Sequence, residues 1–117
     1  MEIDFKHWFR SRCRWSEAIE PGLGSGVGIP DLLMISARNK LFPVELKEGV
    51  WKGDRLFTTK VRAAQINWHK RFKDAGGISY VVVGVKDADV IWVAYVVKDL
   101  TDWKSGWGRD QLQSWKF

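Results

Sequence analysis

The sequence predicts an α/β protein in which a central mixed β-sheet is flanked by helices. Its 117 residues are enough for one hydrophobic core and too few for a second. Two stretches carry apolar residues at helical spacing, and four others are rich in β-branched and further apolar residues. Their order is helix, two strands, helix, two strands, which is typical of a layered α/β or α+β domain. We therefore expect residues 1–117 to form a single domain.

The two helices are predicted at residues 4–15 and at about residues 60–75, where apolar side chains recur every three or four positions. Asp4 stands before the first apolar residue and suits an N-cap. The second helix follows Thr58 and Thr59, which are candidate caps, and a pair of glycines just after it should end it.

The strands are expected at residues 29–35, 41–47, 78–85 and 89–97. The short turn SARNK joins the first two, which should form a hairpin. The third is so uniformly apolar that it should be buried on both faces. The stretch EGVWKGDRLFTT is predicted to be a polar connection, and a short helix is expected from Arg109.

Charge and aromatic content point to an anionic partner. Lysine and arginine outnumber aspartate and glutamate by 19 to 14, which gives a formal charge of +5 and a pI near 9.5. Eight tryptophans are present, and Trp51, Trp103 and Trp107 stand among glycines and charges. Some of these tryptophans are expected to be interface residues.

The single cysteine, Cys13, cannot form an internal disulfide, and packing on a helix is a better interpretation for it than an activated thiol. No stretch has the composition of a signal peptide or of a membrane span. We expect a soluble protein of the cytoplasm, or of the host cytoplasm if the protein is viral, without membrane partners.

Charged residues in the first predicted hairpin demand an explanation. Side chains alternate along a strand, so Glu45 and Lys47 share one face. An odd-length turn centred near Arg38 would place Asp31 opposite Glu45, whereas an even turn or a bulge would not. Two facing carboxylates about 5 Å apart repel unless a positive charge lies between them.

A divalent cation is the simplest such charge. Mg²⁺ and Mn²⁺ are held by one or two carboxylates together with water and phosphate oxygens, and the chain has no cluster of His or Cys that would favour another metal. The alternative is structural: Asp31 caps a turn, while Glu45 and Lys47 form a solvated ion pair at a strand edge.

The arrangement of Pro30 and Asp31, followed fourteen residues later by Glu45, Leu46 and Lys47, resembles the PD-(D/E)xK nuclease signature. The lead GSGVGIPD and the later AAQINWHKRFKDAGGISYVVV resemble more specifically the VRR-NUC branch, which is similar to Holliday-junction resolvases and includes small stand-alone phage nucleases. This resemblance spans residues 17–85 and implies a restriction-endonuclease-like core.

The resemblance also implies residue roles. Asp31 and Glu45 would be metal ligands, the carbonyl of Leu46 would complete the coordination, and Lys47 would be the catalytic lysine. Gln65 matches the helical glutamine that supports the active site in this family, although an exposed helical glutamine is the alternative.

Many members of this family add an acidic residue from the first helix, and here the match is open. Glu20 is preferred because it leads into the glycine-rich segment before Asp31, and Glu17 is second. Glu2 and Asp4, at the start of the predicted helix, are the remaining candidates.

Basic residues around the motif are predicted to contact nucleic acid. Lys52, Arg55, Lys60 and Arg62 follow the catalytic strand and could bind phosphates, while Trp51 could stack on a base. Lys70 and Arg71 are expected on a solvated helix face.

The sequence therefore predicts a DNA endonuclease that uses Mg²⁺ or Mn²⁺, with branched or junction DNA as a possible substrate. Symmetric cleavage of a junction needs two sites, which favours a homodimer. A non-catalytic nucleic-acid-binding module is the alternative. A nucleotide-binding loop at residues 22–28 is disfavoured because no strand precedes it and no GK[ST] motif follows.

Overall fold

The structure is a computed structural model that describes residues 4–19, 28–59, 61–87, 89 and 91–117. Predictions for Glu2, Glu20, Lys60 and most of the glycine-rich segment lie outside these residues. In chain order the elements are α1 (Phe5–Arg12), β1 (Trp15–Ala18), β2 (Leu32–Ile35), β3 (Leu41–Lys52), β4 (Arg55–Thr58), α2 (Ala63–Asp74), β5 (Tyr80–Lys86), β6 (Trp92–Val97), the 3-10 helices η1 (Leu100–Ser105) and η2 (Arg109–Gln111), and β7 (Leu112–Ser114).

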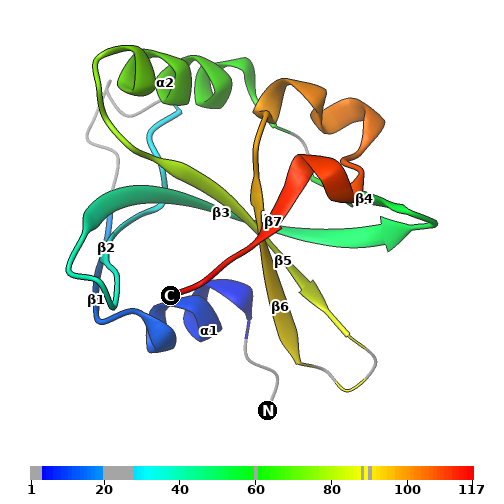
Figure 1. Ribbon diagram of the computed structural model, residues 1–117, viewed down its shortest axis with the longest axis horizontal. Coiled ribbons are helices and arrows are strands. Elements are labelled where there is room, and N and C mark those ends of the chain that lie inside the picture. Colours follow the sequence, from blue (N-terminus) through cyan, green and yellow to red (C-terminus); the bar gives the residue numbers. More distant parts are fainter. Residues whose placement is uncertain (1–3, 20–27, 60, 88, 90) are drawn as a thin grey trace.

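The strands form one open, mixed sheet with α1 and α2 on opposite sides (Figure 1). Its order is β1-β2-β3-β5-β6-β7, and β4 pairs with the far end of β3. β3 and β5 are parallel because the connection between them crosses over through α2, and the other neighbours are antiparallel. The predicted α/β class with a mixed sheet and flanking helices is confirmed. No helix in the described ranges is long and apolar enough to span a membrane.

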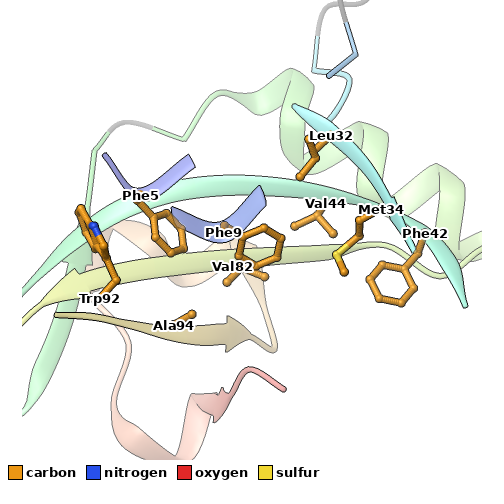
Figure 2. Packing of buried hydrophobic residues seen from close by; sticks show 9 residues of the cluster. All are labelled: Phe5, Phe9, Leu32, Met34, Phe42, Val44, Val82, Trp92 and Ala94. Carbon is orange, nitrogen blue, oxygen red and sulfur yellow. The ribbon is translucent and has the colours of Figure 1, made fainter. Parts of the chain in front are cut away.

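The core on the α1 side is built around two phenylalanines one helical turn apart. Phe5 and Phe9 are 1% and 0% exposed and pack against alternate residues of the sheet, including Val44 and Val82 (Figure 2). A Cβ on Gly84 would lie 2.2 Å from the Phe5 ring. Glycine at this point lets α1 lie close to the sheet, and this fixes where α1 begins.

The core on the opposite face is closed by the C-terminal segment. Trp107 is fully buried, and its N–H and C=O bond to the backbone of Leu56 at 2.9 and 2.8 Å. Trp51 and Trp103 are half-buried against the same cluster. Trp107 is therefore not one of the tryptophans available for an interface, and Trp51 and Trp103 pack within the chain.

Several element boundaries differ from the prediction. The connection expected after residue 47 is instead the continuation of β3, which turns at Gly53 (φ 62°) and returns as β4. β1 and β7 were not predicted, because each is short and gains its stability from pairing with β2 or β6. The short helix from Arg109 is confirmed as η2.

Different features determine where α2 begins and where it ends. Thr58 and Thr59 are not its caps: the N-cap is Arg62, whose N–H donates to Oε1 of Gln65 at 3.0 Å. The predicted glycine stop is confirmed. Gly76 has φ 93° and Gly77 N–H bonds to Phe72 C=O at 2.9 Å, the contacts of a Schellman motif.

His69 ties α2 to the segment that leads into β5. Its Nδ1 shares a 2.7 Å hydrogen bond with Oγ of Ser79, and its Nε2 is buried without a partner. Burial lowers the pKa of His69 to about 4, because the charged ring would lose its hydration. The imidazole is therefore neutral at physiological pH and has a structural role.

This burial predicts acid sensitivity. Since the folded-state pKa is below the ordinary value of 6.5, the stability contributed by neutral His69 is present above pH 6.5 and is lost as pH falls through about 4. The loss amounts to at most about 3 kcal/mol, at about 1.4 kcal/mol per unit. Urea unfolding between pH 7 and 4 should show a smaller loss of stability for His69→Gln than for wild type. His7→Gln, at an exposed histidine, should follow wild type, and equal slopes for all three proteins would contradict the assignment.

Candidate active site

The register of the β2–β3 hairpin brings the two carboxylates of the motif together. Leu32 lies opposite Val44, and every pair of the ladder is centred on Arg38. Extending the register by one residue places Asp31 opposite Glu45. The turn is therefore odd in length and centred on Arg38, which confirms the prediction that such a turn places Asp31 opposite Glu45.

Asp31 occupies a fork in the sheet. Pairing of β3 with β2 ends at Val44, and pairing with β4 starts at Gly49. Between these points the N–H of Leu46 donates to Oδ2 of Asp31 at 3.1 Å. The Asp31 carbonyl accepts from Ile19 N–H at 2.8 Å, which ties the residue to the end of β1. The carboxylate thus binds the edge of β3 where the two hairpins diverge.

Glu45 is a buried carboxyl group with one unsatisfied oxygen. The residue is 4% exposed, and its Oε1 accepts from Nε2 of Gln65 at 3.3 Å, whereas Oε2 has no hydrogen-bond partner. Burial raises the pKa of Glu45 to about 8, and the negative charge of the neighbouring Asp31 raises it further, whereas the positive charges of Lys47 and Arg62 oppose this rise. The predicted support role of Gln65 is matched by this contact.

Lys47 lies on the same face of β3 as Glu45, two residues further along the strand. It is half-buried, and its charge favours the ionised form of Glu45. Leu46, between them, points its side chain to the other face and packs against the α1 core. Glu45 and Lys47 therefore lie on one face of β3, close to Asp31. Leu46 contributes only its backbone to this group of residues.

A cleft of about 310 Å³ opens beside this group, between the start of α1 and the edge of β3. Its lining residues are Asp4, Phe5, Lys6, Asp31, Leu46, Lys47, Glu48 and Thr59. Glu45 does not line the cleft. Asp31 is consequently the carboxylate that both faces the cleft and contacts Glu45.

Of the acids considered for the first helix, the structure brings Asp4 to the cleft. Asp4 is the N-cap of α1, and its Oδ1 accepts from His7 N–H at 2.7 Å. Glu17 lies on β1 opposite Leu33, away from the residues that line the cleft. The preferred residue, Glu20, lies outside the described residues. The packing of Phe5 places the cap beside β3, and this long-range contact has no signal in the local sequence.

The residues that are predicted to contact nucleic acid lie in two parts of the structure, near Glu45 and at the tip of the β3–β4 hairpin. Arg62 is close enough to Glu45 to affect its pKa. Lys52 and Arg55 are at the tip of the β3–β4 hairpin, where Lys52 lies 5.3 Å from the Phe57 ring centre and Arg55 donates to Gly106 C=O at 3.0 Å.

Trp51 belongs to the hairpin rather than to the site. It lies six residues beyond Glu45, roughly 20 Å along an extended strand. Its ring contacts Tyr95 edge-on at 5.7 Å, and the Arg109 guanidinium covers it at 4.6 Å. Base stacking by Trp51 would require Arg109 to move.

Gly28 connects the Asp31 segment to α2. It has φ 85°, and a Cβ here would lie 2.2 Å from the carbonyl oxygen of Ala64, the residue before Gln65. Only glycine fits this contact without displacement. The chain leading to Asp31 is therefore pressed against the turn of α2 that presents Gln65 to Glu45.

These residues fit a hard divalent cation. The donors are carboxylate oxygens, and Oε2 of Glu45 is buried without a hydrogen-bond partner near the Asp31 carboxylate. A cation between the two groups would favour the ionised form of Glu45. Within the described ranges no group of three or more His, Cys, Asp or Glu surrounds one point. Two carboxylates are nevertheless a sufficient protein contribution for Mg²⁺, which keeps water or phosphate oxygens as its other ligands.

Compared with known proteins, the chain has no significant match to a protein-family model, to a curated protein or to a solved structure.

The contact at Gly28 predicts that Gly28→Ala is more destabilising than another substitution at positive φ. Gly76→Ala is the matched control, because its φ of 93° is similar but no atom lies within 4 Å of the added Cβ. Backbone strain should cost about 1 kcal/mol in each variant. The clash with Ala64 should add about 1 to 3 kcal/mol in Gly28→Ala alone. Equal free energies of unfolding for the two variants, measured in urea, would contradict this packing.

Proposed function

We propose that this protein is a metal-dependent DNA nuclease that hydrolyses phosphodiester bonds. The observation that carries the proposal is the pair of facing carboxyl groups, of the half-buried Asp31 and the buried Glu45, with Lys47 on the same face of β3 beside an open cleft. Such a pair is unfavourable for the fold alone. Its sequence context resembles the PD-(D/E)xK motif, and the mixed sheet with flanking helices is compatible with a restriction-endonuclease-like core.

Each residue has a definite task in this proposal. Asp31 and Glu45, with the carbonyl of Leu46, hold Mg²⁺ or Mn²⁺, while Gln65 fixes the orientation of the Glu45 carboxylate. When bound, the cation neutralises phosphate oxygens and lowers the pKa of the attacking water. Lys47 orients that water or stabilises the charge that develops on the phosphate. Asp4, on the cleft wall, is a further polar group and takes the place of the first-helix acid.

Selectivity for branched or junction DNA is the finer form of this proposal. Cleavage of both strands at a symmetric junction requires two active sites, and one chain provides one, so this substrate implies a homodimer. Sedimentation with and without four-way-junction DNA measures that stoichiometry.

A non-catalytic nucleic-acid-binding module is the second candidate. It is favoured by the 4% exposure of Glu45 and by the absence of this residue from the cleft lining. The two candidates differ in one result, because a binding module retains DNA without cutting it.

Cleavage assays test the proposal. Purified protein with Mg²⁺ or Mn²⁺ should cut at least one of supercoiled, nicked, flapped and four-way-junction DNA, and chelation of the metal should stop the reaction. Asp31→Asn and Lys47→Met should each lower the rate by about 100-fold or more, the size of loss expected when a charged group at the reaction centre is removed.

Asp74→Asn is the matched control for this assay, because Asp74 is an exposed carboxylate at the end of α2. It should cut at the wild-type rate. A wild-type protein that leaves every substrate intact would contradict the nuclease proposal. Asp31→Asn and Lys47→Met variants that cut as fast as wild type would contradict the site assignment.

A further inference from the structure

Four basic residues lie on the segments that meet at one end of the sheet, which are the end of α1, the start of β1 and the β2–β3 turn. We name this group the turn patch; its members are Arg10, Arg14, Arg38 and Lys40. Arg14 donates to Oδ1 of Asn39, and Nε of Arg10 donates to Oγ of Ser16 at 3.1 Å. The first bond ties the residue before β1 to the turn that carries Arg38 and Lys40, and the second ties the end of α1 to β1.

The turn that carries this patch is built as a rigid unit. Oγ of Ser36 accepts from the N–H groups of Arg38 and Lys40 at 3.3 Å each, and the Ser36 backbone N–H bonds to Lys40 C=O at 3.0 Å. Asn39 takes the left-handed conformation, with φ 63°. The cationic side chains are therefore presented from a fixed backbone.

No carboxylate of the part of the chain that the structure describes pairs with the turn patch. All four residues are exposed. Trp15, the next residue after Arg14, is 43% exposed and lies in register with Ile35 at the same end of the sheet. Exposed cations beside an exposed tryptophan are a combination that nucleic-acid-binding surfaces use.

The position of the patch relates it to the candidate active site. β2 leads directly from Asp31 to the turn, and five residues of extended chain separate Asp31 from Ser36, roughly 16 Å. Successive phosphates on one DNA strand are about 3.4 Å apart along the helix axis. The patch thus lies about five nucleotides from the cleft, on the side opposite to the β3–β4 hairpin.

We propose that the turn patch binds the phosphate backbone of the DNA that occupies the cleft, and that it is the main electrostatic anchor for that DNA. The inference rests on the proposed function and extends it to a surface outside the PD-(D/E)xK motif. The patch has four cations that pair with no carboxylate among the described residues, whereas at the tip of the β3–β4 hairpin Asp54 lies between Lys52 and Arg55. The patch binds phosphate groups, and it therefore contributes affinity for DNA without a preference for any base sequence.

Binding of fluorescein-labelled 30-nucleotide DNA, single-stranded and duplex, tests the proposal in EDTA, where cleavage does not interfere. Fluorescence anisotropy over a series of salt concentrations gives the dissociation constant and its salt dependence. Replacing both Arg38 and Lys40 by Gln should weaken binding by roughly tenfold near 0.1 M salt and reduce the log–log salt slope for duplex DNA by about 1.8. Arg38→Lys alone keeps the charge and should bind like wild type.

The matched control is the double replacement of Lys70 and Arg71 by Gln, which removes the same charge from the exposed face of α2. It should bind within about twofold of wild type. Equal losses in the two double variants, or an unchanged salt slope for the turn-patch variant, would overturn the proposal, as would a wild-type protein that binds neither DNA. A protein that binds through the turn patch and never cuts DNA would refute the nuclease function and leave this inference standing.

Discussion

The candidate site depends on the enforced proximity of two carboxyl groups. Asp31 and Glu45 face one another across the β2–β3 hairpin, and Glu45 is buried with one oxygen unpartnered. A fold that needed only stability would place apolar residues here, because a buried, uncompensated carboxylate is costly. Gln65 and the close contact at Gly28 hold this unfavourable arrangement in place. This arrangement is explained if a cation from solution binds between the two carboxyl groups.

The rest of the architecture determines how DNA could reach this pair. Phe5 anchors the start of α1 over the sheet, so the cleft opens between that helix and the fork of β3. The parallel pairing of β3 with β5 requires the crossover that carries α2 to the opposite face, where Gln65 meets Glu45. Basic groups then lie on both sides of the cleft. One functional region is thus assembled from segments that are far apart in the chain.

Local patterns in the sequence were sufficient to predict the class of fold, both helices and the end of α2 at its glycines, because these features depend on periodicity and turn chemistry. The pairing of Asp31 with Glu45 was also accessible, because the length of one turn decides it. Contacts between distant segments were not accessible. Nothing near Trp107 indicates that it fills the second core, and nothing near Asp4 places it on the cleft wall. The turn patch likewise forms only when β1 pairs with β2.

The most direct measurement is Mn²⁺ binding followed by electron paramagnetic resonance, in which protein-bound Mn²⁺ loses its sharp six-line signal. Wild-type protein should bind the ion, and both Asp31→Asn and Glu45→Gln should weaken binding by about tenfold or more, a loss typical of a damaged metal site. Asp74→Asn should bind like wild type. If Glu45→Gln binds Mn²⁺ as tightly as wild type, the facing carboxyl groups of Asp31 and Glu45 are not a metal site.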